Sequence, residues 1–239
     1  MAAQAAPVET TKPFDPLSWT TRLVLGVLVL AIALDIVSIV SELSYHSLVD
    51  RGSNGGDVSL AQIQSADDRY STIGWVQTGI YVIAAIFFII WFSRAYKNLG
   101  RLGVEGLRWR DGWAIGAWFV PLLNFVRPKA IADDIWRGSD PELQPRTYLP
   151  EDTSVPWYFH VWWALFIVNV IFSRIAIRQY QNADTLSSLS SATLLLVASD
   201  ALDVIDAVFA AAVVYQTVNR QRTRARVLAD RPSEDALAS

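Results

Sequence analysis

The sequence predicts an all-α integral membrane protein, a four-helix transmembrane bundle with a re-entrant or interfacial helical hairpin on its cytoplasmic side. Three observations lead to this fold class. Apolar residues make up 52% of the chain, they gather in a few long runs, and 16 of the 20 Lys and Arg residues fall on one side of those runs. The charged fraction is 18%, below the roughly 25% of an average soluble domain. The composition therefore indicates a chain that lies in a membrane.

Four apolar runs qualify as membrane-spanning segments, for which a helix needs about 20 residues. Backbone polar groups find no water in hydrocarbon, so these segments have to be helical. The fourth run is the longest and the most polar. We expect the spans at about residues 23–43, 73–92, 157–172 and 193–218. The transmembrane bundle then covers residues 19–219, between an N-terminal tail at 1–18 and a C-terminal tail at 220–239.

The basic residues predict the orientation of the chain, because cytoplasmic loops of membrane proteins are enriched in Lys and Arg. Residues 94–146 hold nine of them and residues 220–231 hold five, whereas the loops on the other side hold four. Nine of the ten Trp residues also fall at or near the basic side, where indole rings favour the headgroup region. We therefore expect a multi-pass protein of the bacterial cytoplasmic (inner) membrane with both termini in the cytoplasm. The N-terminus has no pattern of a signal peptide.

The segment between the second and third spans is apolar but too short to cross. Residues 112–126 are interrupted by Pro121 and are flanked by arginines at both ends, so a crossing would place one basic cluster outside. Pro128 is suited to the first turn of a following helix with one apolar side. We expect residues 112–137 to be re-entrant or to lie in the plane of the inner leaflet.

Two strings in this half of the chain are distinctive. They read WFSRAYKNL at 91–99 and GWAIGAWFVPLLN at 112–124. Both strings, together with residues 127–137 and 218–221, resemble a family of uncharacterised, mostly actinobacterial, multi-pass membrane proteins that is classed as a domain of unknown function. The resemblance implies a membrane location, and the family has no assigned reaction, ligand or catalytic residue. The positions that carry it are Trp91, Arg94, Tyr96, Asn98, Trp113, Trp118, Pro121, Asn124 and Pro128.

Four aspartates fall inside the expected spans, Asp35 in the first and Asp200, Asp203 and Asp206 in the fourth. An acidic residue at mid-membrane costs about 2.5–3.5 kcal/mol on insertion scales, so each of them calls for an explanation. With 3.6 residues per turn, the three on the fourth helix share one face, and Asp35 falls at about the depth of Asp203. We expect this acidic face to point into the bundle.

Two interpretations of the four aspartates stay open. In the first they are structural, protonated or paired with Asn169, Arg174, Arg178 or hydroxyl groups, and they hold the helices together at roughly 0.6–2 kcal/mol per polar contact. In the second they form a site for an ion, a proton or a small ligand. The protein would then be a module for transport or sensing.

A different class of function is also open, that of a non-catalytic accessory or scaffolding subunit. Such a subunit would dock a membrane partner through the Trp-rich cytoplasmic side. We expect no enzymatic activity, because the sequence has no Gly-x-Ser-x-Gly elbow and no phosphate-binding Gly-rich loop. The absence of cysteine excludes thiolate metal sites and iron–sulfur clusters. We expect no cofactor and no metal.

The expected partners follow from the charge pattern. Arg220, Arg222, Arg224 and Arg226 come directly after the last span and are suited to anionic lipids of the inner leaflet. A partner membrane protein or a second copy of the chain is the other expectation. The net charge of −3 argues against a nucleic-acid partner.

Overall fold

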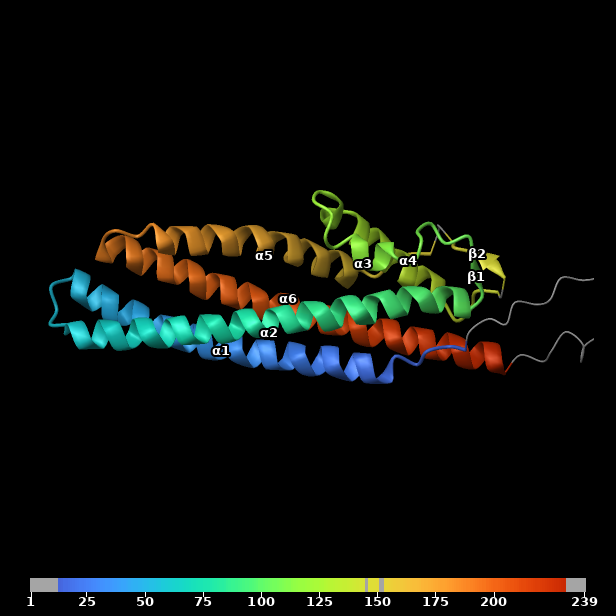
Figure 1. The fold of residues 1–239 in the computed structure, drawn as a ribbon, viewed down its shortest axis with the longest axis horizontal. Helices are drawn as coiled ribbons and strands as arrows, with labels where there is room; N and C mark the ends of the chain where they lie inside the picture. Colours follow the sequence, from blue (N-terminus) through green and yellow to red (C-terminus); the bar gives the residue numbers. More distant parts are fainter. Residues whose placement is uncertain (1–12, 145, 151–152, 231–239) are drawn as a thin grey trace, which may run out of the picture. The chain divides into compact units, whose positions relative to one another are not determined.

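The computed structural model describes residues 13–144, 146–150 and 153–230. Most of the expected N-terminal tail and the end of the expected C-terminal tail lie outside this described part. In chain order the helices are α1 (Ser18–Ser53), α2 (Leu60–Arg101), α3 (Trp113–Gly116), the 3-10 helix η1 (Leu123–Phe125), α4 (Arg127–Gly138), α5 (Trp157–Gln181) and α6 (Leu186–Ala229). Two short strands, β1 (Val104–Glu105) and β2 (Thr147–Tyr148), pair in parallel. The described part is therefore built almost entirely from helices (Figure 1).

Three of the described helices, α1, α2 and α5, are long and apolar enough to cross a membrane. They contain the expected spans 23–43, 73–92 and 157–172, respectively. Helix α6 has the length for a crossing, but its polar residues keep it outside this group of three. The structure therefore supports a helical membrane protein.

The long helices extend well past the apolar runs that predicted them. Residues 60–72 and 219–229 are polar but contain no Gly or Pro, so nothing in them breaks a helix. The expected tail from residue 220 is accordingly helical as far as Ala229. Helix α2 begins with reciprocal bonds between Ser59 and Gln62, the arrangement of a capping box. Hydropathy locates the membrane segments, whereas caps and breakers set the helix ends.

The described residues group into two compact units. The bundle unit consists of Trp19–Ile90 and Pro156–Tyr215. The mixed unit consists of Met1–Ser18, Trp91–Val155 and Gln216–Ser239, as far as the structure describes them. Helices α2 and α6 contribute residues to both units.

In the bundle unit, short turns join α1 to α2 and α5 to α6, and both turns lie at the same end of the unit (Figure 1). Near that end a buried cluster contains Tyr45 and Val49 of α1 and Ala66 of α2, with Tyr180 of α5 packed against it. The ring of Tyr70 lies 4.9 Å from the ring of Tyr180, centroid to centroid. The outward faces carry large exposed apolar side chains, which suits contact with lipid. They include Val29, Ile36, Val40, Val82, Ile86, Val168, Ile171 and Ile175.

The mixed unit has its own core, made by the end of α2 and by α4. Trp91, Tyr96 and Leu99 of α2 and Ile131 and Ile135 of α4 are almost completely buried. These positions recur at helical spacing, so each helix presents one apolar face. The unit thus has a hydrophobic core separate from the cluster near the turns of the bundle unit.

The segment expected to be re-entrant or interfacial, residues 112–137, consists of α3, η1 and α4. Helix α4 begins at Arg127 with Pro128 in its first turn, as the sequence predicts. Between α3 and η1 the chain exposes large apolar side chains: Phe119 is 71%, Leu122 79% and Val126 68% exposed. Leu122 has φ = 65°, a backbone conformation that residues other than Gly rarely adopt. These residues form an exposed apolar tip (Phe119–Val126) of the mixed unit.

Candidate functional site

A polar face of α1 lies inside the bundle unit. Asp35, Ser38 and Glu42 are spaced three and four residues apart, so they lie on one side of the helix. All three are buried, Asp35 completely. Neighbouring residues on the outward side, among them Ile36 and Val40, are exposed and apolar. Helix α1 therefore turns its few polar side chains inward and its apolar ones outward.

Helix α2 supplies two side chains to this face. Gln77 donates from its amide nitrogen to Asp35 Oδ1 at 3.0 Å and to Asp200 Oδ2 at 3.3 Å. Tyr81, one turn further along α2, donates its hydroxyl hydrogen to the same Asp35 Oδ1. A single amide group of α2 therefore connects a carboxyl group of α1 with one of α6.

Helices α5 and α6 complete the cluster. Asp200, Asp203 and Asp206 are spaced three residues apart on α6 and are all half-buried. Asn169 of α5 is buried and donates from its amide nitrogen to Asp203 Oδ1. All four long helices therefore contribute to one polar cluster, defined by Asp35, Glu42, Gln77, Tyr81, Asn169, Asp200, Asp203 and Asp206.

Several oxygens of the polar cluster are buried without a hydrogen-bond partner among the described residues. They are Asp35 Oδ2, Glu42 Oε2, Asn169 Oδ1 and Asp206 Oδ1. A buried polar atom without a partner costs about 1–3 kcal/mol, and in native proteins such atoms often mark a bound water or a functional site. Within the described part of the chain, no Lys or Arg forms an ion pair with these carboxylates. The cluster therefore has free hydrogen-bonding capacity and no positive counter-charge.

The spacing of the acids along the bundle determines which ligands they can contact together. Across residues 13–144, 146–150 and 153–230, no group of three or more His, Asp or Glu side chains is arranged to hold a metal ion. The carboxylates are spread along the bundle, and amide groups lie between or beside them. The arrangement suits a proton or a ligand with hydrogen-bonding groups.

The structure brings some of the sequence-derived candidates together and leaves others apart. The four aspartates and Asn169 lie in the polar cluster. Arg174 and Arg178 are exposed on α5 and form no ion pair with the described residues. Long basic side chains at the end of a helix extend toward water more readily than into a bundle, which accounts for this difference.

Three members of the polar cluster were not singled out by the sequence analysis. Glu42 falls at the end of the first expected span, and its spacing of seven residues from Asp35 puts both side chains on one helix face. Gln77 and Tyr81 are four residues apart in the second span, a spacing that could have predicted a polar face on that helix. Their pairing with Asp35 depends on how the helices are rotated, which the sequence alone does not show.

The residues of the two family-like strings have structural roles in the mixed unit. Tyr96 is completely buried and donates its hydroxyl hydrogen to the backbone oxygen of Trp109 at 2.9 Å. Asn98 donates to the backbone oxygen of Asp15 at 2.7 Å and to Gln221 Oε1 at 2.9 Å. Arg94 Nε donates to Asp15 Oδ2 at 2.8 Å. These side chains tie the segment before α1 and the end of α6 to the end of α2.

The second string supports the same unit through its aromatic rings. The guanidinium group of Arg127 lies 4.0 Å from the ring centroid of Trp113 and 4.5 Å from that of Trp109, which favours a cation–π interaction with each ring. Trp118 contacts Phe92 edge to face, with 5.6 Å between the centroids. Pro121 falls in the apolar tip, and Asn124 has a buried side-chain oxygen without a partner among the described residues.

Three of the four arginines after the last expected span have hydrogen-bond partners within the protein. Arg220 Nη2 donates to Asp140 Oδ2 at 2.8 Å and stacks on Trp136. Arg222 donates to the backbone oxygen of Pro16 at 3.0 Å. Arg224 is completely buried and donates to the backbone oxygen of Leu102 at 2.9 Å. The first three arginines therefore bind groups of the protein itself, and only Arg226 remains an exposed candidate for lipid.

The comparison with known proteins gives one match. Residues 54–219 match the family described as Domain of unknown function (DUF4328). The matched region includes both family-like strings and the α2, α5 and α6 residues of the polar cluster, but not α1 with Asp35 and Glu42. No curated protein and no solved structure matches the chain. Because the match covers more than half of the sequence, this chain belongs to the DUF4328 family.

Proposed function

We propose that this protein is a multi-pass inner-membrane protein whose bundle binds a proton or a small polar ligand at the polar cluster, in the service of transport or sensing. One observation carries the proposal. Asp35 is completely buried, and its Oδ1 accepts hydrogen bonds from Gln77 and Tyr81, while its Oδ2 has no partner among the described residues. A buried, unused carboxyl oxygen is the natural place for a proton, a water molecule or the N–H or O–H group of a ligand.

The arrangement of the polar cluster supports a binding role for the carboxylates over a purely structural role. Structural carboxylates inside membrane proteins are expected to be paired with one another, with cations or with backbone groups. Here the acids lie in a row along α6 and α1, and their partners from other helices among the described residues are neutral amides and hydroxyls, those of Gln77, Asn169, Tyr81 and Ser38. A proton bound to Asp35 Oδ2 would turn this acceptor into a donor and so change the hydrogen bonding of the whole row.

The proposal includes the number of membrane spans and the side of the membrane on which the termini lie. Helix α6 is the fourth span, because its three aspartates share a face with the polar cluster and its opposite face carries exposed apolar side chains such as Ile205 and Val208. Both termini then lie in the cytoplasm. Residues 112–137 lie at the inner leaflet and do not cross it, with the apolar tip in contact with lipid and the surrounding arginines near anionic headgroups.

The test replaces Asp35 with Asn, which keeps the shape of the side chain and removes its titratable proton. The measurements are the infrared band of protonated carboxyl groups and the pH dependence of the unfolding temperature, both on purified full-length protein. Asp35→Asn should remove part of the band and flatten part of the pH response, and Asp203→Asn should do the same. The exposed Asp57→Asn serves as the matched control and should change neither. Wild-type behaviour of Asp35→Asn in both measurements would leave the aspartates with a structural role only.

A second candidate function, a non-catalytic accessory subunit, is favoured by the exposed apolar tip with Phe119 and Leu122. Apolar groups as exposed as these are typical of surfaces that bind lipid or another protein. The two functions predict different effects for substitutions at the polar cluster and at the apolar tip. An accessory subunit should keep its partner protein after Asp35→Asn and lose it when Phe119 and Leu122 are replaced by Ser. A binding module should instead lose its ligand after Asp35→Asn and keep it when Phe119 and Leu122 are replaced by Ser.

A further inference from the structure

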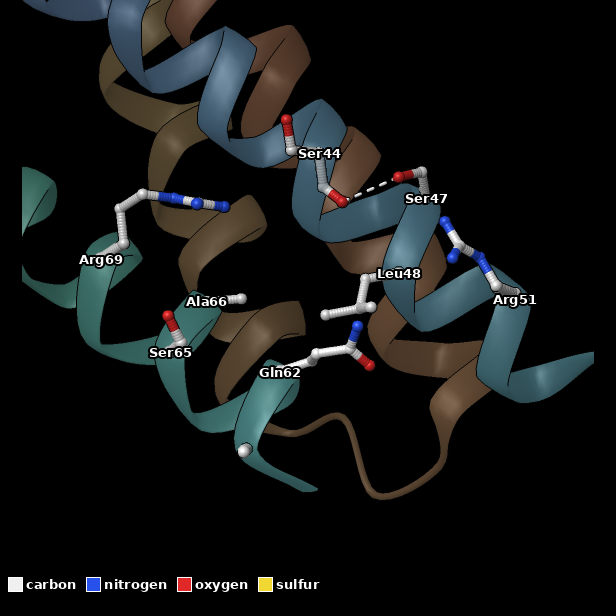
Figure 2. Close-up of a pocket in the computed structure, with 9 residues that line it drawn as sticks. Ser44, Ser47, Leu48, Arg51, Gln62, Ser65, Ala66 and Arg69 are labelled. Atoms are coloured by element: carbon white, nitrogen blue, oxygen red, sulfur yellow. Dashed lines mark hydrogen bonds between the residues drawn. The ribbon is translucent and has the colours of Figure 1, made fainter. Parts of the chain in front are cut away.

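A cleft of about 440 Å³ lies between α1 and α2 in the bundle unit, near the turn that joins them. Its size falls within the range of small-ligand sites, roughly 300–1,000 Å³. Figure 2 shows its lining, with Arg51 on one side and Arg69 on the other. The remaining polar residues are Ser44, Ser47, Gln62 and Ser65. Among the described residues, no carboxylate lines this arginine cleft.

No acidic side chain of the described residues neutralises the two arginines of the cleft. Neither of them forms an ion pair with any residue in the described ranges. Asp50 and Asp68 are their neighbours in sequence, but neither lines the cleft. Arg69 is also held in place, because its Nε donates to Ser41 Oγ at 3.0 Å. This bond leaves both terminal NH₂ groups of Arg69 available as donors.

The other polar groups of the cleft add donors. Gln62 Oε1 accepts hydrogen bonds from the backbone N–H and the hydroxyl of Ser59, so its amide nitrogen remains available. Gln62, Ser65 and Arg69 are spaced three and four residues apart, which places them along one face of α2. Ser44 and Ser47 already donate to backbone oxygens of α1. The cleft therefore presents two guanidinium groups, one amide and one hydroxyl, and no acidic group.

We propose that this cleft binds an oxyanion, a phosphate group carried either by a free solute or by a lipid headgroup. Guanidinium groups recognise phosphate through paired N–H···O bonds, which explains why two of them line one cleft with no acid between them. The site is separate from the polar cluster and opposite to it in charge, so the inference does not depend on the proposed function. It assigns an anionic ligand to the end of the bundle that the basic-residue pattern places outside the cytoplasm.

The experiment uses full-length protein in a non-ionic detergent and has two arms. In the first, inorganic phosphate is titrated at constant ionic strength while the unfolding temperature is followed. In the second, native mass spectrometry measures the retention of phosphatidylglycerol against phosphatidylcholine. Arg51→Gln and Arg69→Gln should each weaken the binding of the responding ligand at least tenfold. Arg178→Gln removes an exposed arginine outside the cleft and should change nothing.

The outcomes separate the two sources of phosphate. A response to inorganic phosphate that both cleft variants lose identifies a free solute, and retention of phosphatidylglycerol that both lose identifies a lipid headgroup. No response in either arm overturns the proposal, and so does an equal loss in Arg178→Gln, because the effect would then be one of total charge. Arg51 makes no ion pair with the described residues, so Arg51→Gln remains informative if Arg69→Gln fails to assemble.

Discussion

At the scale of single residues, Asp134 shows how the mixed unit handles a buried charge. Its side chain is completely buried on α4 and forms an ion pair with Arg108. Burial raises the pKa of Asp134 above the usual value of 3.8, while the guanidinium groups of Arg108 and Arg137 act against this rise and Asp133 adds to it. The unit therefore loses stability as the pH rises from 3.8 through the folded-state pKa, because ionisation is harder in the folded protein than in the unfolded one.

Replacing Arg108 with Gln removes the main counter-charge of Asp134. We expect a loss of about 2 kcal/mol in the free energy of unfolding at neutral pH, where the buried carboxyl group either stays charged without its partner or takes up a proton. Below the usual aspartate pKa the difference should nearly vanish, because Asp134 is then protonated in the folded and the unfolded state. Unfolding curves at several pH values measure this. The control is Arg110→Gln, an exposed neighbour, and an equal loss in both variants would contradict the assignment.

At the scale of elements, the apolar tip combines exposure with an unfavourable backbone. Leu122 adopts φ = 65°, and a non-Gly residue in such a region costs about 1–3 kcal/mol. Gly would avoid this cost, so a large apolar side chain at this position indicates a use for it. Burying an apolar side chain of this size in hydrocarbon contributes about 1.5–3 kcal/mol, enough to offset the strain.

A label at the tip should therefore report lipid. The chain has no native cysteine, so a single cysteine in place of Phe119 can carry an environment-sensitive fluorophore in reconstituted protein. We expect a blue-shifted emission and quenching by lipids with a nitroxide near the headgroup. Tyr148 is 72% exposed, close to the 71% of Phe119, and a label there should show neither effect. Emission typical of water at both positions would mean that the tip does not enter the bilayer.

At the scale of the whole molecule, the sequence predicts what depends on local composition and misses what depends on helix rotation. Three spans fall inside α1, α2 and α5 because hydropathy is a property of consecutive residues. Helical periodicity likewise placed the three α6 aspartates on one face. The bridge made by Gln77 needs two helices in a particular rotation, and no pattern within one helix reveals that. Arg224 looks like a lipid-binding residue locally, yet it is buried by segments far away in the sequence.

The topology can be tested with four single cysteines, at Asp57, Glu105, Asn182 and Asp230. If α6 crosses the membrane, a membrane-impermeant thiol reagent should label the first and third from one side and the second and fourth from the other. Asn182 and Asp230 decide whether α6 crosses the membrane, because Asn182 lies shortly before α6 and Asp230 directly after it. Labelling of both from the same side would reduce the number of spans to three and place the two termini on opposite sides.

The anchoring of the N-terminal segment has a consequence for how the protein is made. The backbone oxygen of Pro16 accepts hydrogen bonds from Arg222, a residue 206 positions later. Asp15 binds Arg94, 79 positions later. The N-terminal partner is synthesised first, so the hydrogen bonds between Arg222 and Pro16 can form only after nearly the entire chain has been synthesised. A chain that ends before Arg222 can contain α1, α2 and α5 in full and still leave the mixed unit open. Because the mixed unit of such a truncated chain lacks these hydrogen bonds, we expect proteases to cleave it faster than the mixed unit of the full chain.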